Sequence, residues 1–296
     1  MNLTTLPMPL LARPLYEHLG YRGALLVPMM GAVAAAFAAR ALARRLGGSG
    51  WLAFAAVGAA SPVLIYALDL WEHALGLGLM AWAVVVAYDV RTARARPAWG
   101  LLVGALFGLA ATMRTEALLY GAWCVAAFGV LLWCSQRKWR PTTVFGATAL
   151  VGVALPLVAN FGLERAVIGT SLRAGRAIGT AQSSGANFTV RMHEAVTTTF
   201  GVRGLSDVRE DALLGLFFVA AIVCTLWCAM SPARRSFAPK SAAVTVAVFA
   251  VSCALGWGFV PGLLIASPLA AAGLSVLRRR SSARELALVA LGPLPL

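Results

Sequence analysis

The sequence predicts an all-α fold, a polytopic bundle of helices embedded in a membrane. Of 296 residues, 60% are hydrophobic and only 12% are charged, which is typical of membrane proteins. The apolar residues form runs long enough, or nearly long enough, to cross a hydrocarbon core of roughly 30 Å as helices. We predict about nine such spans, at 22–43, 51–68, 74–90, 98–113, 117–134, 142–161, 212–230, 241–260 and 262–277. A partial tenth begins near Glu285 and stops at Leu296.

The spans form two modules around one longer polar segment. Residues 1–161 make an N-terminal transmembrane module, and residues 212–296 make a C-terminal module that ends inside its last apolar run. Residues 162–211 form a loop region rich in Gly, Ser and Thr, and Leu163 to Ile168 can continue the preceding helix.

Residues 1–20 differ from both modules. They lack the basic start and apolar core of a signal peptide. Their three prolines, Pro7, Pro9 and Pro14, are expected to break any long helix. We therefore expect an interfacial segment that lies on the membrane.

The distribution of basic residues predicts the orientation. One alternate set of loops carries 16 of the 25 basic residues but only two of the 11 acids, Asp89 and Glu285. The positive-inside rule places that set in the cytoplasm, so 69–73, 114–116 and 162–211 face outward. Arginine is abundant beside only two lysines, Lys138 and Lys240, and this bias, with the abundant alanine, indicates the plasma membrane of a GC-rich bacterium.

The net charge of +14 does not indicate nucleic-acid binding. The basic residues occur in short runs between apolar segments, and no basic stripe interleaves with aromatic residues. The five cysteines all lie in apolar segments, and Cys224 and Cys228, which share a helix face, make no zinc site on their own. We expect membrane lipid as a partner, no nucleic acid and no metal.

The densest group of ionisable and aromatic residues runs from Tyr66 to His73, between the second and third spans. On a helix, Asp69 would lie one turn from Glu72 and His73, so their side chains would share a face. Three interpretations remain open: a metal site, general acid and base groups, or acids that favour the N-terminus of the next helix.

Arg114 and Glu116 follow the fourth span, and the next span begins almost at once. Both residues should therefore lie at the outer rim, where an arginine can hold a phosphate bidentately. The alternative is structural, with Arg114 paired to Glu116, Asp69 or Glu72 to fix the helix ends.

Three glycines in the fourth predicted span, Gly100, Gly104 and Gly108, are four residues apart. No strand precedes them, so they do not form a phosphate-binding loop. Their spacing instead predicts close packing of two helices.

The order of these features resembles the GT-C superfamily of membrane glycosyltransferases, and is similar to bacterial members related to protein O-mannosyltransferases and aminoarabinose transferases. The residues that carry the resemblance are the prolyl segment with Leu15-Tyr16 and Leu19 to Gly23, the pair Ser61-Pro62 followed by Tyr66, Asp69 and Glu72-His73, Gly100 to Gly108 with Arg114 and Glu116, and Pro261 to Pro268.

The resemblance implies inverting transfer of a sugar from a polyprenyl-phosphate donor, with no further cofactor, to an acceptor on the outer face. It implies catalytic roles for Asp69, Glu72 and His73, and substrate binding by Arg114, Glu116 and Tyr66. A further acidic base, implied in the first external loop, has no counterpart here. We therefore expect this sequence to be an internal part of a longer protein.

Two other function classes remain open. A transporter or lipid flippase would fit the spans. Such proteins usually have charged residues near the middle of the membrane, however, and no charged residue lies in the middle of any predicted span. A non-catalytic membrane scaffold or a degenerate remnant of a transferase is the other alternative.

Overall fold

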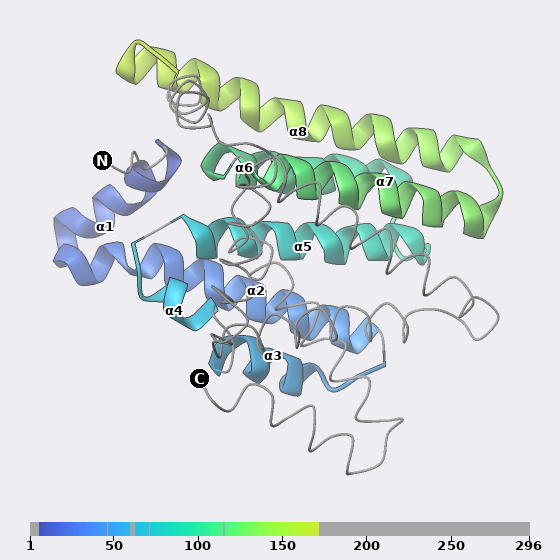
Figure 1. Ribbon diagram of the computed structural model, residues 1–296, viewed down its shortest axis with the longest axis horizontal. Coiled ribbons are helices and arrows are strands. Elements are labelled where there is room, and N and C mark those ends of the chain that lie inside the picture. The colour runs from blue at the N-terminus through green and yellow to red at the C-terminus, as the bar shows by residue number, and fades with distance from the viewer. Residues whose placement is uncertain (1–5, 46, 60–62, 71, 115, 172–296) are drawn as a thin grey trace, which may run out of the picture. The chain divides into compact units, whose positions relative to one another are not determined.

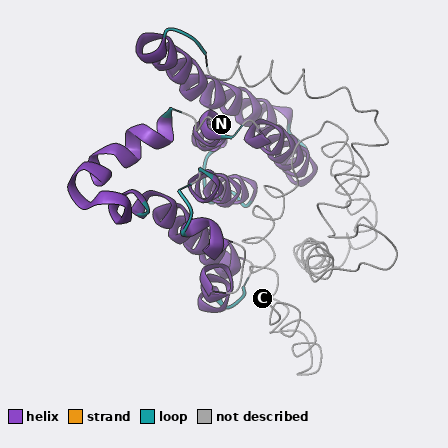
Figure 2. Ribbon diagram, turned by 60° about the vertical axis from the view of Figure 1, so that its left-hand side comes forward, coloured by secondary structure: helices purple, strands orange, loops and turns teal. Residues whose placement is uncertain are grey.

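The computed structural model describes residues 6–45, 47–59, 63–70, 72–114 and 116–171, which form helices and loops without a strand (Figures 1 and 2). The all-α prediction is confirmed for this part of the chain. Its elements are α1 (Pro7–Ala24), α2 (Leu26–Arg45), α3 (Gly50–Ala59), α4 (Val63–Ala67), α5 (His73–Arg91), the 3₁₀ turn η1 (Pro97–Trp99), α6 (Gly100–Met113), α7 (Glu116–Gln136) and α8 (Trp139–Ile168).

The chain divides into two compact units. The first comprises Met1–Ala38 and Ile65–Thr180, and the second comprises Ala39–Leu64 and Ala181–Leu296. The first unit holds α1, most of α2 and α5 to α8. In the second, the structure describes the end of α2, all of α3 and the start of α4.

Three described helices are long and apolar enough to cross a membrane: α2, α5 and α8. They match the spans predicted at 22–43, 74–90 and 142–161. Helices α6 and α7 are apolar as well, and they match the spans predicted at 98–113 and 117–134. The spans predicted from 212 onward lie outside the described residues.

The predicted span 51–68 needs a correction. The structure describes two helices there, α3 with 10 residues and α4 with five, and neither is long enough to cross a bilayer alone. The sequence contains a reason, because Pro62 between them has no amide hydrogen to donate to a continuous helix.

Helices α5 to α8 make the core of the first unit. Helix α6 contacts α5, α7 and α8, and α7 also contacts α5 and α8; Figure 1 shows the four lying side by side. Leu77, Phe107 and Phe145 are buried between them. Leu150, Leu155 and Val158 on α8 are apolar and exposed, as expected of a surface that meets lipid.

The close helix packing predicted from the glycine spacing is confirmed. A Cβ atom added to Gly100, Gly104 or Gly108 would run into α8, at the backbone of Phe145, Ala149 and Val153 respectively. Each glycine therefore meets the residue 45 positions later, so α6 and α8 run parallel in one register. Gly152 on α8 makes the reciprocal approach to α6, as small residues do where membrane helices pack closely.

Helix α1 corrects the expectation that its prolines break a long helix. Pro7 and Pro9 lie in the first turn, where backbone amides have no intrahelical acceptor, so the missing N–H groups cost no hydrogen bond. The helix continues past Pro14. The interruption comes instead at Gly20, whose φ of 65° and ψ of −156° are non-helical. The inner face of α1, at Met8 and Ala12, packs in one apolar cluster with Leu70 and Leu75, which flank the turn before α5.

Glycine is therefore expected to be required at position 20 because of its backbone conformation, and not because a side chain would clash there. We expect Gly20→Ala to lower the free energy of unfolding by about 1–3 kcal/mol, because this backbone region is essentially restricted to glycine. No atom lies within 4 Å of a Cβ placed there, so the loss would be conformational. The free energy is measured by denaturant titration of the purified protein in detergent.

Gly162→Ala is the matched control for this change. Gly162 lies inside α8 and also has no atom within 4 Å of an added Cβ, but its backbone is helical. Alanine there should be neutral or stabilising by up to about 1 kcal/mol. Equal losses in the two variants would contradict the role given to the Gly20 conformation.

Candidate functional site

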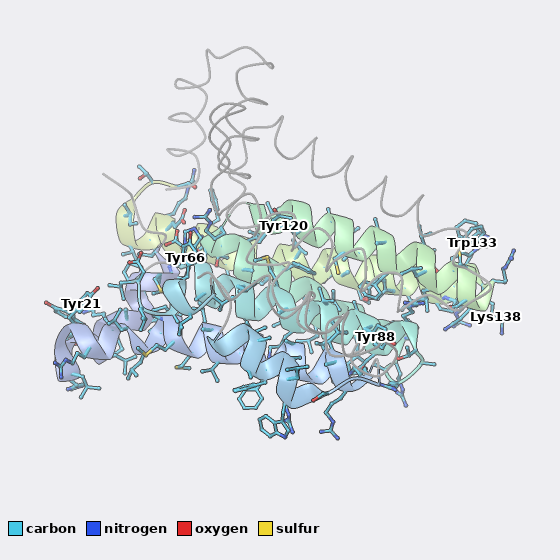
Figure 3. All side chains as sticks on the ribbon, turned by 60° about the horizontal axis from the view of Figure 1, so that its bottom comes forward. Tyr21, Tyr66, Tyr88, Tyr120, Trp133 and Lys138 are labelled. Atoms are coloured by element: carbon cyan, nitrogen blue, oxygen red, sulfur yellow. The ribbon has the colours of Figure 1, made fainter. Side chains whose placement is uncertain are left out.

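Two connections of the first unit lie at the same end of its helices: the turn from α4 to α5 and the junction of α6 with α7. Figure 3 shows Tyr66 at this end, whereas Tyr88, Trp133 and Lys138 lie at the opposite end. We call Tyr66, His73 and Arg114 the Arg114 cluster. The three come from α4, α5 and the end of α6, so the fold brings together residues that the sequence separates.

Arg114 occupies a very short helix connection. It ends α6 in an extended conformation, its amide donates to the carbonyl of Ala110 at 2.8 Å, and its own carbonyl accepts from the amide of Ala117 at 3.1 Å. Its stem passes over α5, where a Cβ added to Gly76 would lie 3.9 Å from the Arg114 Cγ. The prediction that Arg114 sits at a helix end is confirmed.

Two aromatic rings lie beside this arginine. The rings of Tyr66 and His73 have centroids 4.9 Å apart and planes inclined by 30°, and the charge of Arg114 acts on both side chains. Burial raises the pKa of the Tyr66 phenol, the Arg114 charge lowers it and the Asp69 carboxylate raises it. The net shift is upward, so Tyr66 is a neutral hydroxyl donor at neutral pH.

The acids of this region differ in their surroundings. Glu72 is 7% exposed and His73 is 6% exposed, whereas Asp69 is exposed. Helix α4 ends at Ala67 and α5 begins at His73, so Asp69 lies in the intervening turn. The expectation that Asp69, Glu72 and His73 share one helix face is therefore wrong.

Glu72 is the N-cap residue of α5, the position at which an acid favours a helix N-terminus, but its side chain makes no capping hydrogen bond to that helix. The structural interpretation of this acid therefore stays open. The metal interpretation finds no support, because no three His, Cys, Asp or Glu side chains gather around a common point in the part of the chain that the structure describes. Glu116 begins α7, and its side chain lies outside the described set.

A buried carboxylate that the sequence interpretation missed is Glu164, near the end of α8. It is 2% exposed, and its two oxygens accept from Asn160 Nδ2 at 2.9 Å and from Ser171 Oγ at 3.2 Å. The parallel register of α6 and α8 puts Glu164 beyond the level at which α6 ends, at the same end as Arg114. In the sequence, only the spacing of Asn160 and Glu164, which is one helical turn, could have indicated this contact.

Comparison of the chain with models of protein families, with curated proteins and with solved structures finds no match. The chemistry of the site must therefore be inferred from its own residues. A half-buried guanidinium beside a phenol and an imidazole offers several hydrogen-bond donors to one anion. The planar guanidinium group can donate two parallel hydrogen bonds, and this geometry matches two oxygens of one phosphate.

Proposed function

We propose that this protein is a membrane glycosyltransferase of the GT-C type, which takes a sugar from a polyprenyl-phosphate donor and transfers it to an acceptor on the extracytoplasmic face. The observation that carries the proposal is the Arg114 cluster, which places a cation and two polar aromatic rings at one end of an apolar bundle. A polyprenyl donor has matching parts, since its phosphate needs a cation at the rim and its tail needs an apolar surface.

Each residue has a proposed role. Arg114 binds the donor phosphate through its guanidinium fork, and Tyr66 donates its hydroxyl hydrogen to the same group. His73 and Glu72, both buried, are the proposed proton acceptors for the attacking hydroxyl of the acceptor. Asp69 is exposed and is assigned to the approach of the acceptor, and Glu116, at the start of α7, to substrate binding.

The proposal includes the finer architecture predicted from the sequence. It has about nine spans and a partial tenth in a bacterial plasma membrane, with α3 and α4 together in place of the single helix predicted at 51–68, and with the Arg114 cluster and the region 162–211 outside. The excess of arginine in the alternate loops supports this orientation.

The positions of the buried ionisable groups favour a transferase over a transporter. In the described ranges, the buried acidic and histidine side chains, those of Glu72, His73 and Glu164, lie at or near helix ends. Coupling sites of transporters usually lie near the bilayer midplane. Reactions with a lipid-linked donor instead take place at the membrane surface.

The test is donor consumption by the full chain in native membranes. Wild-type protein should release polyprenyl phosphate from a radiolabelled polyprenyl-phosphate sugar. His73→Gln should lower the rate by about 100-fold or more, because general-base contributions are of this size. The matched control is His18→Gln, which changes an exposed histidine on α1. Equal rates for the two variants would contradict the role of His73, and no release by wild type would favour a scaffold.

A further inference from the structure

The second unit carries a basic cluster that the proposed reaction does not use. Arg40 and Arg44 are one turn apart near the end of α2, and Gly50 begins α3 beside them. A Cβ added to Gly50 would lie 2.9 Å from the Arg40 Cγ and 2.8 Å from the Arg44 Cγ. The stems of both arginines therefore pack over the first residue of α3.

Trp51 fixes the first of these guanidinium groups. The Arg40 Cζ lies 4.2 Å from the centroid of the Trp51 ring, a cation–π distance, and the ring is braced at its edge by Phe54, with centroids 5.7 Å apart at 79°. Within the described ranges, the Arg40 Nε is buried and has no hydrogen-bond partner. A held guanidinium with an unmatched buried donor is suited to an acceptor from outside the chain.

The segment that carries these arginines contains no acidic residue that could pair with Arg40. Residues 39–64 contain Arg40, Arg44 and Arg45 but neither Asp nor Glu. Arg45 is used in the fold, since its Nη1 donates to the carbonyl of Ala41 at 3.0 Å and helps to end α2. Arg44 is exposed. The ligand that matches two neighbouring guanidinium groups is a phosphate.

The surface next to the cluster indicates where that phosphate comes from. Trp51 is 63% exposed, and Ala55 and Gly58, one and two turns further along α3, are exposed on the same face. A Cβ added to Gly58 would meet no atom within 4 Å. This apolar track starts at the guanidinium groups, and only a phosphate that carries a hydrocarbon chain would use it.

We propose that Arg40, Arg44 and Trp51 bind the headgroup phosphate of an anionic phospholipid, whose acyl chain lies along Trp51, Ala55 and Gly58. The site lies in the cytoplasmic leaflet under the proposed orientation. It does not depend on transferase activity. Basic pockets at this surface commonly bind anionic lipid headgroups, and tryptophan is enriched at the same depth.

The test is lipid retention by the full-length chain in detergent, measured by native mass spectrometry with phosphatidylglycerol and phosphatidylcholine of equal chain length. Wild type should retain phosphatidylglycerol preferentially. Arg44→Gln should weaken its binding about fivefold, because each cation at a membrane surface contributes an interaction of this size. Arg40→Lys keeps the charge but loses the planar stack on Trp51, and should weaken binding by a similar factor.

Two comparisons keep the proposal separate from general charge effects and from loss of folding. Arg94→Gln removes one exposed charge after α5 and should leave retention unchanged, and all variants should keep the wild-type thermal midpoint. Equal retention of the two lipids, or an equal loss in Arg94→Gln, would overturn the proposal. Displacement of the lipid by millimolar inorganic phosphate would also overturn it, since the ligand would then be free phosphate.

Discussion

Replacing Arg114 with glutamine is expected to lower kcat/KM for the polyprenyl-phosphate donor by about 100-fold to 1000-fold, as the loss of a group that stabilises developing charge does in other enzymes. Glutamine keeps hydrogen-bonding capacity but has neither the charge nor the fork of the guanidinium. Arg114→Lys restores the charge alone, so its kcat/KM should lie between those of glutamine and arginine. The measurement is release of polyprenyl phosphate as a function of donor concentration.

The control for Arg114→Gln is Arg140→Gln. Arg140 is exposed in the first turn of α8, two residues after Lys138, which lies at the end of the bundle away from Tyr66 (Figure 3). It should leave kcat/KM unchanged. A similar loss in both variants would show a general effect of charge on the membrane protein, and no loss at Arg114 would remove it from the proposed donor site.

Gly104→Ala is expected to have the largest effect on stability, a loss of about 1–3 kcal/mol or more, as overpacking of a close contact produces. The added methyl group would run into the carbonyl of Ala149 on α8, and backbone cannot move aside as a flexible side chain can. Because α6 carries Arg114 at its end, a shift of α6 against α8 should also lower donor consumption. Denaturant titration in detergent and the donor assay measure the two effects.

Gly146→Ala makes the same chemical change on α8. Gly146 is helical, and a Cβ added there meets no atom within 4 Å. This variant should be as stable as wild type or more stable by up to about 1 kcal/mol. If Gly104→Ala were equally well tolerated, the parallel packing of α6 on α8 would be wrong.

The features that the sequence predicted well are those set by local spacing. Glycine recurs every four residues at Gly100, Gly104 and Gly108. On an apolar helix, such a repeat lets a neighbouring helix approach closely. Arg114 follows one apolar run and precedes the next by two residues, so it had to lie at a helix end. Neither inference needed knowledge of which helices are neighbours.

The features that the sequence did not predict depend on tertiary contacts or on one backbone angle. The burial of Glu164 requires the length of α8 beyond α6, and the exposure of Asp69 requires α4 to end at Ala67. The stacking of Tyr66 on His73 joins two helices across a turn. The kink of α1 falls at Gly20 and not at Pro14, because a proline inside a helix removes one hydrogen bond whereas Gly20 changes the path of the chain.

The central claim is that the Arg114 cluster binds the phosphate end of a polyprenyl-phosphate donor. Photo-crosslinking tests it most directly: the full chain in native membranes is irradiated with a polyprenyl phosphate that carries a diazirine in its first isoprene unit, and the crosslinked peptides are identified by mass spectrometry. Crosslinks are expected within 66–76 and 110–117, and Arg114→Gln should reduce them whereas Arg140→Gln should not. Crosslinks that avoid both segments, or that are equal in the two variants, would contradict it.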